Sequence, residues 1–118
     1  MNIEEYRVYC LSKPGTSEAT PFDEITLVFK VGGKMFALCN MNSFEFINLK
    51  CDPDRAIELR EEYSFIRPGF HMSKVHWNSV YLNQGIKLDL LGELIDHSYE
   101  LVFSSLTKKL QFEILSLD

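Results

Sequence analysis

Residues 26–41, TLVFKVGGKMFALCNM, decide the fold that the sequence predicts. Leu27, Phe29 and Val31 recur at every second position, which is the period of a strand with one buried face. Two consecutive glycines follow at once, and both can adopt the positive φ angles that a type I′ hairpin turn requires. A second apolar stretch then covers residues 35–41. The pattern predicts an antiparallel hairpin.

Further elements extend from this hairpin in both directions along the chain. Asp52 and Pro53 form a strong helix start, because the carboxylate caps free amides and proline needs no amide hydrogen there. Apolar spacing predicts helices over residues 2–12, 53–63 and 88–106, with a candidate break at His97, and strands over residues 45–50, 65–66 and 76–82. Residues 16–24 are predicted as a loop, and residues 110–118 as one more helical segment.

The resulting order, α-β-β-β-α-β-β-α, predicts an α+β fold in two layers, with helices packed on an antiparallel sheet. A chain of 118 residues has the length of one domain, which we expect to span residues 1–118. With 46% hydrophobic and 25% charged residues, the composition is that of a globular protein and excludes wholesale disorder.

The sequence also indicates the cellular compartment of the protein. No window approaches the roughly 18 apolar residues of a membrane span, so we expect no membrane partner. The first residues contain two acids and no basic segment, unlike a secretion signal. Cys10, Cys39 and Cys51 are odd in number and form no C-x-x-C pair, which predicts buried thiols in a reducing, cytoplasmic setting.

The distribution of charge is more informative than its total. A net charge of −5 argues against a protein held to nucleic acid by its overall charge. Between residues 63 and 88, however, there is no carboxylate at all. This window contains basic residues, histidines and aromatic residues together: Arg67, Lys74, Lys87, His71, His76, Phe65, Phe70, Trp77 and Tyr81. Cations interleaved with flat rings are what a nucleic-acid surface needs, although a chance acid-free window with its aromatics in the core gives the same pattern.

Within the window, residues 67–80, RPGFHMSKVHWNSV, resemble the MmcQ/YjbR family of small bacterial proteins. The usual family pattern there is P-G-Y-H-M-N-K-x-H-W-N-x-V, and the likeness extends from Lys13 to Lys109. Two positions depart from it, Phe70 where tyrosine is usual and Ser73 where asparagine is usual. Any hydrogen bond from a hydroxyl at position 70 is therefore absent. The resemblance implies a two-layer fold like that of secretion chaperones, and it implies a DNA-binding protein with no established reaction, catalytic residues or cofactor.

The leading hypothesis is a non-enzymatic module that binds DNA weakly and in a salt-sensitive manner, through a local basic and aromatic surface. The candidate residues are Arg67, His71, Lys74, His76, Trp77 and Asn78. The cations would contact phosphate, the tryptophan would stack on a base or anchor the core, and the asparagine would bind a base or hold a turn.

The same residues offer little support for metal binding or catalysis. His71 and His76 would fall on opposite faces of a strand, so no metal site is expected, and an acid–base pair of His76 with Glu18 is not favoured. The alternative is a protein-interaction or chaperone-like scaffold, monomeric or homodimeric, with an exposed apolar strip at Leu110, Phe112, Ile114 and Leu117. A small-molecule pocket would be favoured if residues 71–78 lined a deep cleft.

Overall fold

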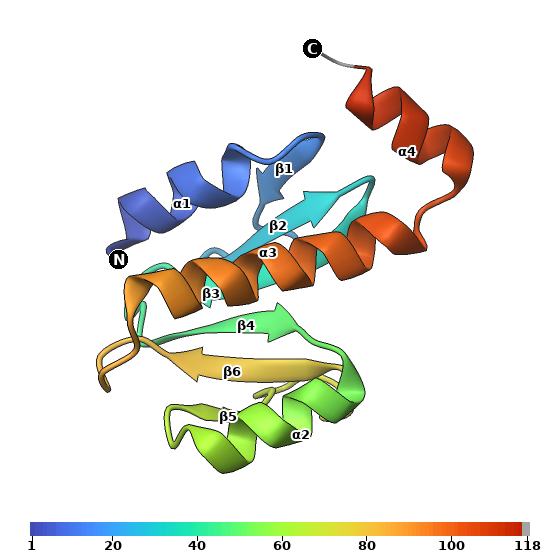
Figure 1. The fold of residues 1–118 in the computed structure, drawn as a ribbon. Coiled ribbons are helices and arrows are strands. Elements are labelled where there is room, and N and C mark those ends of the chain that lie inside the picture. The colour runs from blue at the N-terminus through green and yellow to red at the C-terminus, as the bar shows by residue number, and fades with distance from the viewer. Residues whose placement is uncertain (117–118) are drawn as a thin grey trace.

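The computed structural model, which describes residues 1–116, contains a six-stranded antiparallel sheet with helices on one face (Figure 1). The elements follow in the order α1 (Ile3–Leu11), β1 (Thr16–Ala19), β2 (Thr26–Val31), β3 (Lys34–Asn40), β4 (Phe46–Lys50), α2 (Pro53–Glu62), β5 (Ile66–Pro68), β6 (Trp77–Tyr81), α3 (Leu88–Ser105) and α4 (Lys108–Leu115). The strands lie in the order β1-β2-β3-β4-β6-β5. The predicted α+β, two-layer architecture is confirmed. None of the described helices is both long and apolar enough to cross a bilayer.

The predicted hairpin is the pair β2 and β3. Gly32 and Gly33 take φ angles of 56° and 82°, as a type I′ turn demands, and Val31 pairs with Lys34 across it. A Cβ on Gly32 would lie 2.6 Å from Leu106 Cδ1, so a larger residue there would also displace the side chain that follows the end of α3. Local sequence and tertiary packing therefore demand the same residue.

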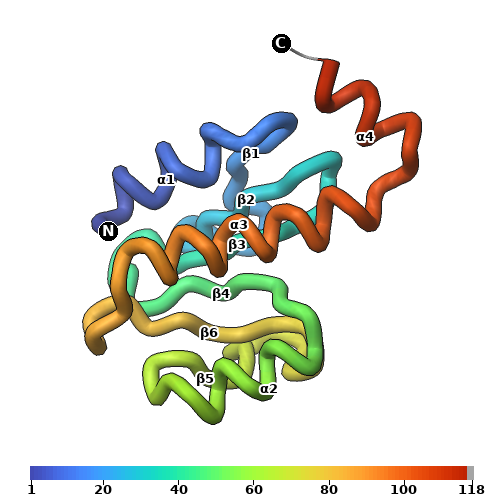
Figure 2. The backbone as a smooth tube through the Cα atoms, viewed as in Figure 1, coloured from blue at the N-terminus to red at the C-terminus, as the bar shows by residue number. Residues whose placement is uncertain are grey.

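The main core lies between the sheet and α1, α2 and α3. Figure 2 shows α1 and α2 on opposite sides of α3, although they are far apart in the chain. Buried rings join the layers: Tyr6 meets Phe29 edge to face at 5.3 Å, and Phe36 meets Tyr99 at 5.4 Å. The Ser98 hydroxyl of α3 donates to the Phe36 carbonyl, which links the long helix to the central strand. The three cysteines are free and buried, as predicted.

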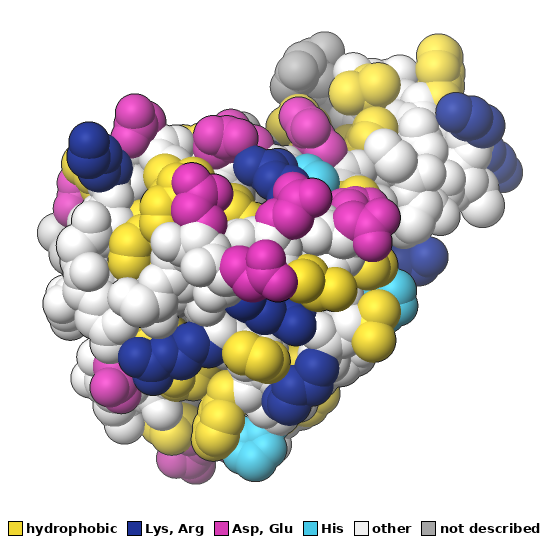
Figure 3. All heavy atoms as spheres, turned by 60° about the horizontal axis from the view of Figure 1, so that its bottom comes forward, with side chains coloured by type: hydrophobic (Ala, Val, Ile, Leu, Met, Phe, Trp, Pro, Cys, Tyr) yellow, Lys and Arg dark blue, Asp and Glu magenta, His cyan; other side chains and the backbone are white. Residues whose placement is uncertain are grey.

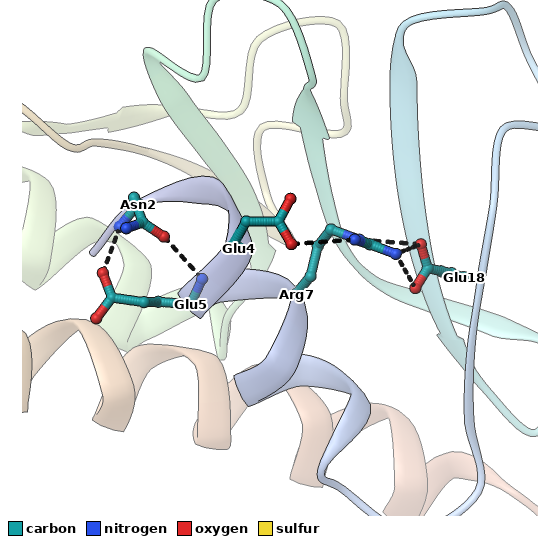
Figure 4. Close-up of polar contacts among 5 residues, drawn as sticks. All are labelled: Asn2, Glu4, Glu5, Arg7 and Glu18. Atoms are coloured by element: carbon teal, nitrogen blue, oxygen red, sulfur yellow. Dashed lines mark hydrogen bonds and ion pairs between the residues drawn. The ribbon is translucent and has the colours of Figure 1, made fainter.

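The prediction of a loop over residues 16–24 was wrong at its start, because Thr16–Ala19 form the edge strand β1. This segment, TSEA, has no apolar alternation that would signal a strand. It is a strand because it pairs with β2, and because Arg7 of α1 holds Glu18 through three hydrogen bonds of 2.8, 3.0 and 3.1 Å (Figure 4). Asn2 and Glu5 form the capping box that starts α1 in the same view.

The C-terminal half contains two further differences from expectation. The candidate break at His97 is absent, and α3 runs unbroken through it. The last helical segment is α4, which Figure 1 shows beyond the end of the sheet. Ile114 is buried there, whereas Phe112 is exposed, and Leu117 lies outside the described residues. The predicted apolar strip is therefore only partly exposed.

The opposite edge of the sheet is the short strand β5. Gly69 N donates to Trp77 O, and Tyr81 N donates to Phe65 O. In an antiparallel pair such hydrogen bonds recur at every second residue, so the backbone groups of residues 65, 67 and 69 face β6. The amides of Ile66 and Pro68 therefore face away from β6. Ile66 N donates to the Tyr63 carbonyl at 3.1 Å, and Pro68 has no amide hydrogen.

Candidate functional site

No described helix packs on the second face of the sheet, which we call the open face. Its interior is a small cluster of Val28, Leu38 and Trp77, with Met35 and Met72 packed against it. Trp77 is only 8% exposed, so of its two predicted roles the structure supports the core anchor. The prediction that its ring is available to stack on a base is corrected.

Asn78 points to the other face of the sheet and is 2% exposed. Its Oδ1 accepts a hydrogen bond of 2.6 Å from Nε of Arg60 in α2, and its Nδ2 donates to the Ala56 carbonyl at 3.5 Å. Asn78 is therefore not exposed at the surface, and its side-chain hydrogen bonds run to α2 rather than within a turn. The prediction is corrected: this residue fastens α2 to the sheet.

Across the open face runs a continuous series of contacts that we call the aromatic row: Arg67, Tyr81, Phe46, Phe70 and His71. The guanidinium of Arg67 lies 4.3 Å from the centre of the Tyr81 ring. The ring centres of Tyr81 and Phe46 are 5.0 Å apart, those of Phe46 and Phe70 5.9 Å, and those of Phe70 and His71 4.1 Å. Phe70 is 54% exposed, and both ends of the row are exposed.

Buried polar side chains hold the β5–β6 loop that carries Phe70. Ser79 Oγ accepts from Phe70 N at 2.9 Å, and Asn48 Nδ2 donates to Phe70 O at 3.1 Å. The loop also needs Gly69, because a Cβ there would lie 3.0 Å from the Trp77 carbonyl oxygen. His71 adopts a left-handed conformation with a φ of 57°, which turns the chain immediately after Phe70.

The basic residues predicted for the site differ in the contacts that they make. Arg67 is exposed at one end of the row, whereas the Lys74 amine donates to the Gly69 carbonyl within its own loop. His76 is exposed, and its carbonyl accepts from Cys51 N at 2.8 Å. On the face in Figure 3, Lys and Arg side chains lie among hydrophobic ones below a band of acidic side chains.

Two lysines of the open face were missed by sequence reasoning. Lys50 pairs with Trp77 across the β4–β6 ladder, and Lys30 follows Val28 by two positions on β2. Their side chains therefore belong to the same face as the small cluster. Both lie outside the acid-free window, so the window alone could not select them.

Phe46 and Tyr81 were also missed as functional residues. They are direct partners in the β4–β6 register and alternate with the buried Ile47 and Val80. The two-residue period could have placed each on a face away from the core. Their pairing was not predictable, because β4 and β6 are separated by α2 and β5.

Beside the row is a groove of about 530 Å³ on the open face. Phe22, Ile25, Met35, Leu38, Phe46, Phe70, His71 and Met72 supply its large side chains, and Asp23, Thr26, Cys39, Asn40 and Asn48 complete its lining. Hydrogen bonds from the backbone amides of Ile25 and Thr26 lower the pKa of Asp23. Residues 71 and 72 enter this groove, but the rest of the segment 71–78 does not.

The acid–base pair of Glu18 with His76 does not form. Glu18 lies on β1 and is held by Arg7, whereas His76 precedes β6, with three strands between β1 and β6 in the sheet order.

Comparison with known proteins agrees with this architecture. The YjbR family model matches residues 11–101. The chain is 41% identical to the uncharacterized protein YbdF of Escherichia coli O157:H7 over 84% of its length and 82% of that protein. It is 33% identical to the uncharacterized protein YjbR of Escherichia coli K12 over 85% of this chain and 86% of that one.

Solved structures show the same fold. The crystal structure of a Deinococcus radiodurans protein with a DUF419 domain superimposes with a TM-score of 0.90 and 38% identity, covering 96% of this chain and 87% of that one. A Pseudomonas syringae protein structure superimposes with a TM-score of 0.72 and 27% identity, covering 86% of this chain and 99% of that one.

Proposed function

The chain belongs to the YjbR family, and we propose that it is a non-enzymatic module that binds single-stranded DNA across the open face of its sheet. The observation that carries this proposal is the aromatic row, which joins three rings to a guanidinium at one end and an imidazole at the other. Every base has a π-face, so such a row can hold a strand without reading its sequence.

The geometry favours single strands over duplexes. The rings of the row belong to strands or to a clamped loop, so their positions are preorganised. The Phe46 and Phe70 rings are nearly perpendicular, at 84°, so we propose that the exposed Phe70 ring is the main stacking contact for a base. A base inside a duplex is already stacked on its neighbours and cannot lie on these rings without being extruded. Stacking contributes roughly 1–3 kcal/mol per base in comparable surfaces.

Phosphates would be neutralised by the cations of the same face, Lys30, Lys50 and Arg67. Few phosphates can be neutralised by so few side chains, and the net charge of −5 repels the rest of the strand. We therefore propose binding that is weak and lost as salt is raised.

Fluorescence anisotropy of labelled oligonucleotides tests the proposal. A single-stranded oligothymidine, the same sequence as RNA and a matching duplex are titrated at low and at physiological salt. We expect Phe70→Ala to weaken binding of the single strand by about tenfold, as the loss of one stacking contact implies. Phe112→Ala is the matched control, because Phe112 is 73% exposed on α4.

A second pair of variants tests the electrostatic part. Arg67→Gln should weaken binding and reduce its salt dependence, whereas Lys108→Gln on α4 should leave both unchanged. The proposal fails if no strand binds at low salt, if the duplex binds more tightly than the single strand, or if Phe70→Ala and Phe112→Ala behave alike.

The alternative, a protein-interaction scaffold, is favoured by one observation. Phe112 and Leu115 are 73% and 62% exposed on the outer face of α4. Under this alternative, Phe112→Ala would abolish self-association or partner capture and Phe70→Ala would not, so the same two variants separate the two functions. Sedimentation of a strict monomer together with an empty pull-down would count against it.

A further inference from the structure

The groove beside the aromatic row carries an inference of its own. We infer that it is a pocket for one unstacked nucleobase, which enters edge-on while its neighbours lie on the row. The inference rests on the proposed function for the source of the base, because Phe46 and Phe70 belong to both the row and the groove. A strand that follows the row therefore reaches the groove without leaving the surface.

Size and lining define the class of ligand. At about 530 Å³ the groove falls within the range of small-molecule sites and has room for a nucleoside. Three phenylalanine rings and the thioethers of Met35 and Met72 lie among its walls. Rings and polarizable sulfur atoms make favourable contacts with the faces and edges of other aromatic rings. A planar aromatic ligand is therefore a better fit than a flexible aliphatic chain.

Charge determines which part of a nucleotide can enter. No lysine or arginine is among the lining residues, and Asp23 supplies a carboxylate whose pKa is lowered by backbone hydrogen bonds. A phosphate would meet this anion without a compensating cation, so it stays outside, near the lysines of the open face. The neutral base is the part that the groove can accept.

One polar side chain can recognise an edge of the base. Asn40 Oδ1 accepts hydrogen bonds from Asn42 N and Ser43 N at 2.8 and 3.0 Å, which fixes the orientation of the carboxamide. Its Nδ2 donates to no residue within the described part of the chain, and Asn40, a half-buried residue, lines the groove. A ring nitrogen or carbonyl oxygen of a base would accept from this donor.

The fluorescence of Trp77 can report nucleoside binding directly, because Trp77 is the one tryptophan of the chain. It lies in a cluster with Met35, Leu38 and Met72, which line the groove. We would titrate the four free nucleosides and follow Trp77 emission, exciting at its red edge, with N-acetyltryptophanamide correcting for light absorption and collisional quenching. At least one nucleoside should give a saturable change. Toluene and cyclohexane, as apolar probes, should bind at least tenfold more weakly.

Two variants localise the site. Phe22→Ala removes a wall side chain that is 64% exposed and should weaken nucleoside binding severalfold, whereas Phe112→Ala should not. Asn40→Asp keeps both acceptor contacts of the turn and removes the Nδ2 donor, so it should also weaken binding while the far-ultraviolet spectrum and melting temperature confirm folding. The inference is overturned if no nucleoside gives a saturable change, if apolar probes bind as tightly, or if both groove variants bind as the wild type does.

The proposed function and the nucleobase pocket can be disproved independently of each other. Oligonucleotide binding that depends on Phe70, with no response to nucleosides, leaves the proposed function standing and removes the pocket. A saturable nucleoside response without oligonucleotide binding removes the proposed function and leaves the pocket as a site for a free heteroaromatic compound.

Discussion

Ser79 and Phe70 are joined by a hydrogen bond of 2.9 Å from the backbone amide of Phe70 to the hydroxyl of Ser79, which is fully buried. The same hydroxyl donates to Asn48 Oδ1, and Asn48 Nδ2 returns to the Phe70 carbonyl. Both polar groups of the Phe70 backbone are thus satisfied by two strands of the sheet. The exposed ring of the aromatic row is held by buried polar side chains beneath it.

Removing this hydroxyl should destabilise the protein. Ser79→Ala leaves the Phe70 amide and Asn48 Oδ1 without a partner, so we expect a loss of about 1–3 kcal/mol in the free energy of unfolding. Urea denaturation followed by circular dichroism measures it. Ser104→Ala, at an exposed position of α3, is the control and should change stability by less than about 0.5 kcal/mol. Equal stabilities of the two variants would show that the hydroxyl contributes nothing.

The contact between Arg60 and Asn78 should behave as a coupled pair. Arg60→Met removes the donor from a buried acceptor and should cost about 1–3 kcal/mol. In the double variant with Asn78→Leu the losses should fall short of additivity, with a coupling energy of about 1 kcal/mol or more. Arg55→Met, which removes an exposed ion pair with Glu93, should cost at most about 1 kcal/mol. Additive losses across the cycle would contradict the pairing.

Stability should decrease on mild acidification because of His97. Burial, and then the charge of Arg55, lower the pKa of His97 below 6.5, outweighing the opposite influence of Asp52, Glu93 and Glu100. Its neutral Nε2 accepts from Asp52 N at 3.2 Å, at the start of α2.

The sign of the effect follows from that direction. The unfolded chain takes up its proton first as pH falls below 6.5, so the free energy of unfolding should decline from there until pH passes the lower pKa of the folded state. Urea denaturation at a series of pH values should show a shallower decline for His97→Gln than for the wild type. Parallel curves would exclude His97 as the origin.

The cysteines should resist alkylation in the folded protein. Burial raises the pKa of Cys39 to about 12, and burial likewise dominates in raising the pKa of Cys10 to about 12. The thiolate is the reactive form, so at mildly alkaline pH iodoacetamide should modify them on the order of a hundredfold more slowly than glutathione. Guanidinium chloride should expose all three thiols, which intact mass measures. Adducts forming on the native protein at the glutathione rate would contradict their burial.

The sequence predicted those elements whose signal is local. The hairpin turn at Gly32 and Gly33 and the helix start at Asp52 were correct, because conformation and capping there depend on adjacent residues. Strand β1 was missed, because TSEA becomes a strand only by pairing with β2. Its partner contact with Arg7 lies on another element, which no local pattern reveals.

In the candidate site, too, local features were predictable from the sequence and long-range contacts were not. Periodicity places Trp77 and Asn78 on opposite faces of β6, but it cannot say what covers each face. Trp77 was buried by loop and strand residues on the open face, and Asn78 by α2, whose Arg60 supplies the partner that a buried amide needs. Arg67 and His71 remained exposed, and the row that joins them was visible only once β4 and β6 were paired.

The edge strand β5 limits how copies of this protein can associate. Its outward amides are either absent, at Pro68, or already bonded, at Ile66, so this edge offers no donor to an incoming strand. The other edge of the described sheet is β1. Growth of a fibril by edge-to-edge pairing needs donors and acceptors at both edges of each copy, so the missing donors of β5 oppose it. The short, proline-containing strand β5 therefore opposes polymerisation through this edge of the sheet.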